Sequence, residues 1–174
     1  MLKLLKKIFC TGVSTEAIDQ NDQAAIEFEK IGAACRRLIN KYFSGSLAIR
    51  MVDAGSCNAC ELEMHALNNV FYNSERFGIH FVASPRHADV LLVSGPVSRN
   101  MEAALKTTYE AMPYPKLVIA MGDCAACGGE FGESYASSGK VANIIPVNAI
   151  IAGCPPTPLI ILKAILQILK VKKL

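Results

Sequence analysis

Four cysteines of this chain have the residue type and the placement that a metal centre needs. Cys57 and Cys60 form a Cys-x-x-Cys pair, while Cys124 and Cys154 each stand in a short glycine-containing turn. Each of these positions closes an apolar, strand-like run. Four thiolates brought together at strand ends would hold a metal centre, and a 4Fe–4S cluster uses four cysteines. The pattern therefore points to electron transfer.

The spacing alone leaves other chemistry open. A lone Cys-x-x-Cys is also found in zinc half-sites and in thiol–disulfide motifs. Cys124 and Cys127 form a second such pair, so a structural zinc ion is a competing prediction, with the ligands Cys57, Cys60, Cys124 and Cys127. That site would leave Cys154 without a role. Two further alternatives are a redox dithiol, which would use only the first pair, and buried cysteines that pack in the core and have no chemical role.

Acidic residues follow the first cysteine pair. Glu61 and Glu63 stand at the start of an expected helix, where negative charge is favourable. A carboxylate close to a redox centre could also exchange protons, and Glu63 is our candidate for this role.

We expect His65, His80 and His87 to be surface or packing residues rather than ligands. No nucleotide-binding loop is present, so the chain has no complete active site of its own.

Apolar runs supply the scaffold for these turns. We expect strands at 47–52, 79–83, 90–93, 117–121 and 149–152, and helices at 24–42, 61–72, 101–112 and 159–171. Continuous apolar strands that alternate with helices predict an α/β fold with a parallel sheet covered on both faces. In such sheets ligands collect beyond the carboxyl ends of the strands, where all four chosen cysteines fall.

Length and composition fit one folded domain with a sizeable core. The chain has 174 residues, of which 52% are hydrophobic, and this suggests surfaces buried against other subunits. No apolar run reaches the roughly 18 residues of a membrane span. We expect residues 1–45 to hold an amphipathic segment, a polar linker at 11–23 and a helix in which Cys35 packs. Residues 46–174 would form the sheet domain.

Charge is concentrated at the two ends of the chain. Residues 1–9 and 163–174 together carry seven lysines and no acidic residue, whereas the remainder has 11 basic and 15 acidic residues. Basic, leucine-rich ends fit an anionic membrane surface or a partner subunit, although ordinary solvated helix ends would look the same.

The basic residues form no stripe with aromatics, so we expect no nucleic-acid partner. Seven cysteines without an export signal predict a reducing compartment.

Several longer motifs resemble one known family. They lie within residues 46–165, at 55–63, 75–78, 84–96, 114–124, 145–147 and 153–157. Together they look like the small subunit of membrane-bound, energy-converting NiFe hydrogenases, including formate hydrogenlyase. The same family includes the complex I subunit that carries the terminal cluster before quinone.

The resemblance implies a flavodoxin-like fold with one 4Fe–4S cluster at the carboxyl ends of the strands, held by Cys57, Cys60, Cys124 and Cys154. It implies three kinds of partner: a hydrogenase large subunit that carries the NiFe site, a ferredoxin-like iron–sulfur subunit and integral membrane subunits. The chain would pass electrons to or from the NiFe site during proton reduction or hydrogen oxidation. Its expected place is peripheral, on the cytoplasmic side of the membrane.

Departures from the family pattern separate its branches. The complex I subunit has two adjacent cysteines, whereas this chain has Cys-x-x-Cys, which favours the hydrogenase branch over quinone reduction. Exported uptake hydrogenases carry further clusters in a C-terminal extension, whereas this chain ends soon after Cys154, so we expect a single cluster. Two alternatives stay open, a quinone- or sulfur-reducing complex I-like module and a zinc-stabilised structural protein. Cys127 matches no position of the family pattern.

Overall fold

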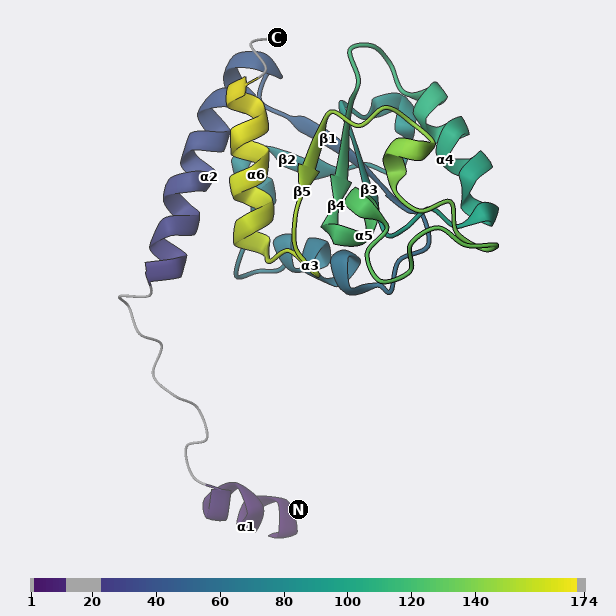
Figure 1. Cartoon of the computed structure of the whole chain (residues 1–174). Helices are drawn as coiled ribbons and strands as arrows, with labels where there is room; N and C mark the ends of the chain where they lie inside the picture. The colour runs from purple at the N-terminus through teal and green to yellow at the C-terminus, as the bar shows by residue number, and fades with distance from the viewer. Residues whose placement is uncertain (1, 12–22, 172–174) are drawn as a thin grey trace.

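The computed structural model describes residues 2–11 and 23–171, and at its centre lies a parallel β-sheet with helices on both faces (Figure 1). The strands are β1 (Leu47–Asp53), β2 (Ile79–Phe81), β3 (Val90–Ser94), β4 (Leu117–Met121) and β5 (Ala149–Ile151). Their order is β2-β1-β3-β4-β5, and all four pairings are parallel. This is the flavodoxin-like order, as predicted.

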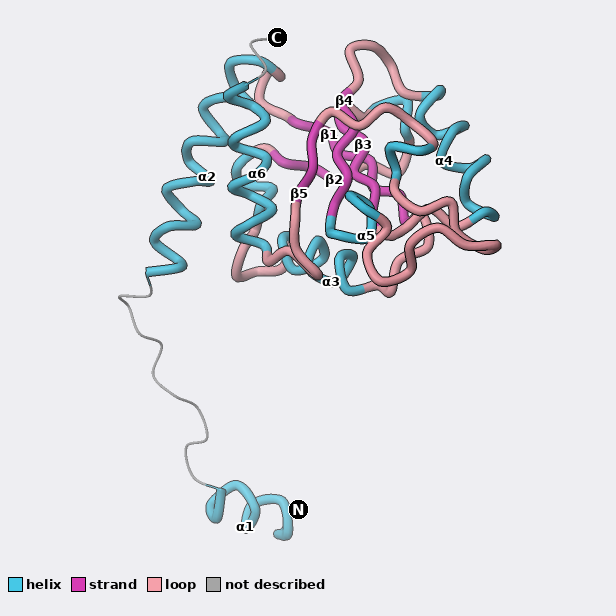
Figure 2. Tube along the Cα trace, in the orientation of Figure 1, coloured by secondary structure: helices cyan, strands magenta, loops and turns pink. Residues whose placement is uncertain are grey.

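Two helices precede the first strand, and the other α-helices follow β1, β3, β4 and β5 along the chain. The α-helices are α1 (Leu2–Thr11), α2 (Gln23–Tyr42), α3 (Ala59–Leu67), α4 (Arg99–Ala111), α5 (Gly122–Cys127) and α6 (Pro158–Val171). Short 3-10 helices lie at η1 (Ser74–Phe77), η2 (Pro85–His87) and η3 (Val141–Asn143). Figure 2 shows that α3 and α5 lie at the same end of the sheet. The carboxyl ends of β1 and β4 therefore both lead into helices at that end.

Two of these helices differ from the sequence prediction. We expected α3 to reach residue 72, but it ends at Leu67. The Asn69 side chain accepts hydrogen bonds from the backbone N–H groups of Phe71 and Tyr72, both at 2.9 Å, and so offers the chain a turn in place of the helix. We did not predict α5, because six residues that include a glycine and two cysteines carry little helical signal.

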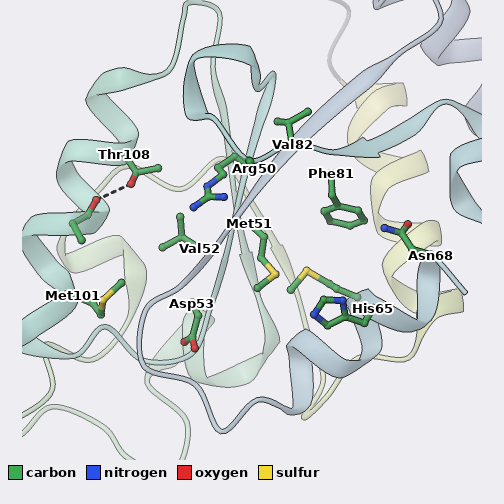
Figure 3. Close-up of a pocket in the computed structure, with 13 residues that line it drawn as sticks. Arg50, Met51, Val52, Asp53, His65, Asn68, Phe81, Val82, Met101 and Thr108 are labelled. Carbon is green, nitrogen blue, oxygen red and sulfur yellow. Dashed lines mark hydrogen bonds between the residues drawn. The ribbon is translucent and has the colours of Figure 1, made fainter.

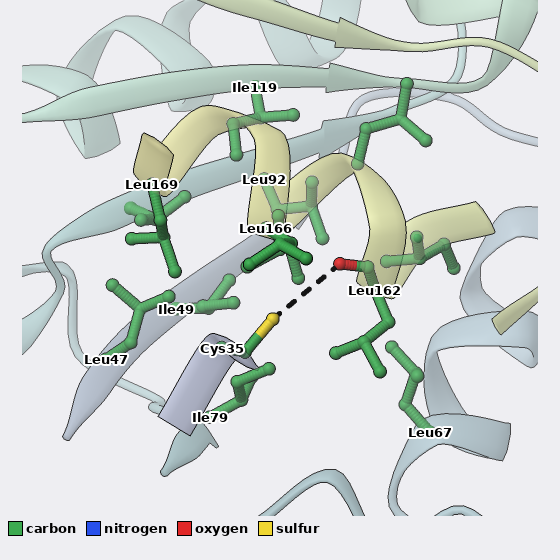
Figure 4. Close-up of a cluster of buried hydrophobic side chains, with 14 of the residues drawn as sticks. Cys35, Leu47, Ile49, Leu67, Ile79, Leu92, Ile119, Leu162, Leu166 and Leu169 are labelled. Atoms are coloured by element: carbon green, nitrogen blue, oxygen red, sulfur yellow. Dashed lines mark hydrogen bonds between the residues drawn. The ribbon is translucent and has the colours of Figure 1, made fainter. Parts of the chain in front are cut away.

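One face of the sheet is covered by α2, α3 and α6, which share a hydrophobic core with the strands. Cys35 of α2 is fully buried there, and its Sγ lies 3.9 Å from the carbonyl oxygen of Leu162 (Figure 4). Burial raises the pKa of Cys35 to about 12, so this thiol is neutral. Cys35 is thus a packing residue, as predicted. Helix α2, which we assigned to residues 1–45, packs on α6 and contributes to the core of the sheet domain.

The other face is covered by α4, whose Leu105 is fully buried against β3 and β4 residues. Residues 90–94 and 117–121 are buried throughout, as expected for strands covered on both sides.

The N-terminal segment forms a helix, α1, in agreement with its helical spacing. Lys3, Lys6 and Lys7 are exposed, and so is the ring of Phe9. The predicted polar linker falls mainly on residues 12–22, which lie outside the described residues. Within 2–11 and 23–171, no helix combines the length and the hydropathy that a membrane-spanning segment requires.

Candidate metal centre

The first cysteine loop begins where β1 ends, at Asp53. Its Oδ1 accepts hydrogen bonds from the backbone N–H groups of Gly55, at 2.8 Å, and Ser56, at 2.7 Å. These bonds close a tight turn after the strand. Asn58 then adopts a left-handed conformation, with φ of 71°, directly before α3. As a result Cys57 lies exposed in the turn and Cys60 lies half-buried in the first turn of the helix.

The second loop begins where β4 ends, and it contacts the first. Cys60 Sγ lies 4.0 Å from the carbonyl oxygen of Met121. Gly122 follows with φ of 85°, and a Cβ atom at this position would lie 2.7 Å from Cys60 Sγ. Glycine is therefore required twice, for its backbone conformation and for the space that the sulfur occupies. Helix α5 starts at this glycine and carries Cys124.

The third loop follows β5 and is tied to the second. The N–H of Asp123 donates to the carbonyl of Gly153 at 3.0 Å, and the N–H of Gly153 donates to Asp123 Oδ1 at 2.9 Å. This reciprocal pair fixes the backbone before Cys154 beside the backbone before Cys124. The structure therefore brings together the three loops that carry the predicted ligands.

The thiols are close enough to influence one another. The pKa of Cys60 is raised to about 12, by burial first and then by the negative charges of Glu61, Cys57, Cys124 and Cys154. The pKa of Cys124 is also raised, by burial first and by Cys154 next. Four thiolates at such a site repel one another, so a bound cation is needed to keep them all deprotonated.

Cys127 lies differently from the other cysteines of this region. It is exposed, and its Sγ is 3.1 Å from the carbonyl oxygen of Asp123 in its own helix. Cys154 instead follows Gly153, whose backbone is hydrogen-bonded to Asp123 directly before Cys124. This arrangement favours Cys154 over Cys127 as the fourth member of the group.

The zinc alternative requires its ligands to converge on one ion. Among the described residues, no three His, Cys, Asp or Glu side chains lie close enough to hold one metal ion. Zinc requires its sulfur ligands about 2.3 Å from a single point. A 4Fe–4S cluster binds its four cysteines through different irons, so it does not require the sulfurs to converge on one point. Gly129 leaves further room, since a Cβ there would lie 2.6 Å from Cys124 Sγ.

A buried carboxylate, which the sequence placed only at the start of a helix, supports the first loop. Glu61 is only 3% exposed, and its Oε2 accepts a hydrogen bond from Ser56 Oγ at 2.6 Å. Its Oε1 accepts a hydrogen bond from the buried hydroxyl of Ser94 at the end of β3. Glu61 thus joins the loop of Cys57 to the centre of the sheet. Glu63, our predicted proton relay, is half-buried in α3.

Comparison with known proteins agrees with this geometry. Residues 57–168 match the family described as NADH ubiquinone oxidoreductase, 20 Kd subunit. A probable membrane-bound hydrogenase subunit, mbhJ, from Pyrococcus furiosus is 42% identical over 130 residues, which cover 75% of this chain and 78% of that protein. Formate hydrogenlyase subunit 7 from Escherichia coli is 40% identical over 126 residues, 72% of this chain but only 49% of that protein.

A solved structure shares the fold as well as the sequence. A chain of the membrane-bound sulfane sulfur reductase, an archaeal respiratory membrane complex, superposes with a TM-score of 0.66 at 34% identity, over 77% of this chain and 74% of that one. The family match spans every predicted ligand and more than half of the chain. This protein therefore belongs to the family of the 20 Kd subunit of NADH ubiquinone oxidoreductase, whose relatives include subunits of hydrogenases.

Proposed function

We propose that this chain holds one 4Fe–4S cluster through Cys57, Cys60, Cys124 and Cys154, and that it transfers electrons within a larger oxidoreductase. The observation that carries the proposal is the meeting of three strand-end loops, in which burial and the neighbouring thiols raise the pKa of Cys60 and Cys124 and glycines leave no side chain against the sulfurs. When bound, such a cluster accepts and releases single electrons at a potential set by its surroundings.

The residues of this chain have distinct tasks in that role. The four cysteines would hold the iron, and Gly122 would let the backbone come close to it. Glu61 would keep the first loop in place through its two serine partners. Glu63 is our candidate for moving a proton near the centre, because it stands one helical turn beyond Cys60.

The complex we propose is a membrane-bound NiFe hydrogenase. The names of the relatives and the Cys-x-x-Cys spacing both support this branch. The large subunit with the NiFe site would dock on the side of the cysteine loops, where Leu62, Phe131 and Tyr135 are exposed by 61%, 60% and 97%. Exposed apolar side chains of this size are typical of interaction surfaces. A ferredoxin-like subunit and membrane subunits would complete the assembly, on the cytoplasmic side of the membrane.

A second candidate is reduction of sulfur in a related membrane complex. It is favoured by the 34% identity to a chain of the sulfane sulfur reductase. Both candidates need the same cluster and differ in the substrate of the partner subunit. Assays of the purified complex with hydrogen and with polysulfide would separate them.

Metal analysis of the full chain tests the cluster itself. We expect the anaerobically reconstituted protein to contain about four iron and about four sulfide per chain, with broad absorbance near ~400 nm. Zinc in about one equivalent, with no sulfide, would instead indicate a structural protein.

A further inference from the structure

Strand β1 is longer than its outer neighbour, and a cavity opens where the neighbour stops. β1 runs from Leu47 to Asp53, but β2 pairs only with residues 47–49. The cavity beyond has a volume of about 560 Å³, and we call it the β1 groove. Its walls come from β1, α3, α4 and residues 81–83, and Met64 is among the lining residues. Figure 3 shows how Arg50, Met51, His65, Met101 and Thr108 lie in this lining.

The groove exposes an open strand edge. The carbonyl of Ile49 still accepts a hydrogen bond from the N–H of Val82, at 2.9 Å. Every second residue of a strand presents its N–H and C=O to the same neighbouring strand. Ile49 faces the β2 side, so Met51 presents its N–H and C=O to that side too. No strand of the described residues pairs with β1 there. An extended segment from outside would find a partner for its own backbone groups at this edge.

The groove also holds a cation without a partner. Arg50 Nε is buried and has no hydrogen-bond partner, and among the described residues the Arg50 side chain makes no ion pair, although its backbone belongs to the β1–β3 ladder. In Figure 3 its guanidinium points to the α4 side, near Val52 and Thr108. Asp53 is the only carboxylate in the lining, and its Oδ1 is taken by the turn before Cys57. A buried guanidinium N–H is unfavourable without an acceptor, and no atom of the described residues accepts from Arg50 Nε, so a carboxylate of another molecule would be favourable there.

We propose that the β1 groove receives an extended segment of a partner subunit and that an Asp or Glu of this segment pairs with Arg50. The proposal rests on the proposed function in one respect, namely that this chain works inside a larger complex. A peptide fits better than a free anion for two reasons. The open edge of β1 requires N–H and C=O groups, and the thioether side chains of Met51, Met64 and Met101 require apolar contact.

Zero-length cross-linking in the purified complex tests the pairing. Arg50→Lys places an amine in the groove. A carbodiimide activates a carboxylate in direct contact with that amine, the amine attacks to form an amide, and the carbodiimide leaves as a urea. We expect an amide between residue 50 and an Asp or Glu of another subunit, identified by mass spectrometry. Lys106 and Glu102 of this chain, 2.8 Å apart, give an internal positive control.

The same reaction, run with added acetate, separates a filled groove from an empty one. An acetyl group on residue 50 without any link to another subunit would overturn the proposal. A link from residue 50 only to residues of this chain would also overturn it.

Charge reversal gives a second, independent test. We expect Arg50→Glu to weaken binding of that partner about thirtyfold or more, since one member of a buried charge pair then repels the other. Arg37→Glu, on the exposed part of α2, is the matched control. The iron content of each variant is measured alongside. Weak binding of Arg50→Glu with iron retained supports the proposal, and equal binding by the Arg50→Glu and Arg37→Glu variants overturns it. A complex that forms the cross-link at residue 50 but contains no iron contradicts only the proposed function.

Discussion

At the scale of residues, the choice between Cys154 and Cys127 decides what kind of centre this chain can hold. Cys154 belongs to the loop that is tied to Asp123, whereas Cys127 is turned to the carbonyl of its own helix. We therefore predict that Cys154→Ser loses or converts the cluster and that Cys127→Ser retains it. Iron per chain and the EPR signal of the reduced state report the outcome. The reverse pattern would show that the ligand set is wrong.

The two glutamates near Cys60 should separate into a functional and a structural residue. We predict that Glu63→Gln lowers hydrogen turnover of the complex, on the order of 10²-fold, with the iron content unchanged. Glu61→Ala should instead destabilise the folded chain by about 1–3 kcal/mol, because the hydroxyl of buried Ser94 loses its carboxylate acceptor and keeps only the more distant carbonyl of Val52, at 3.5 Å. Turnover assays and denaturant unfolding measure the two effects. Full activity of Glu63→Gln would leave that residue without a role in proton transfer.

At the scale of elements, the start of α5 offers a clean test of the space around the sulfurs. We predict that Gly122→Ala reduces iron incorporation, because its Cβ would lie 2.7 Å from Cys60 Sγ. Gly132→Ala is a matched control, since this glycine also has a positive φ, of 53°, but nothing lies within 4 Å of the added Cβ. Both changes carry a backbone cost of about 1 kcal/mol. Equal iron in the two variants would mean that the glycine at 122 is not needed for the centre.

Helix α1 has a separate expected role in attachment. Its exposed Lys3, Lys6 and Lys7 could each add about 1 kcal/mol of attraction to an anionic surface, and a helix of about ten residues is marginal in water without a partner. We predict that deletion of residues 1–10 keeps the cluster and the large-subunit contact but weakens retention on membranes. Fractionation with salt washes measures this retention. Unchanged retention at every salt concentration would refute an anchoring role.

At the scale of the whole molecule, the sequence was sufficient for the five strands and the long helices, but not for the end of β2, which was expected at residue 83 and lies at Phe81, nor for the contacts around the cysteine loops. Runs such as Leu117–Met121 are buried on both faces, so their continuous hydrophobicity reveals them. The placement of four cysteines beyond strand ends follows from the same reasoning. The early end of α3 depends on one Asn side chain, and the partners of Glu61 are 5 and 33 positions away. The β1 groove exists because β2 is short, which no local pattern indicates.

The measurement that tests the central claim most directly is reduction of the proposed cluster by hydrogen in the assembled complex. Under anaerobic conditions, hydrogen should produce the EPR signal of a reduced 4Fe–4S cluster in the wild type and in Cys127→Ser. The part of the EPR signal that comes from the proposed cluster should be missing from the Cys154→Ser complex. This loss distinguishes that part of the signal from the signals of clusters in other subunits. If the complex oxidises hydrogen with an artificial acceptor while the Cys154-dependent signal never appears, this chain is not the carrier next to the catalytic site.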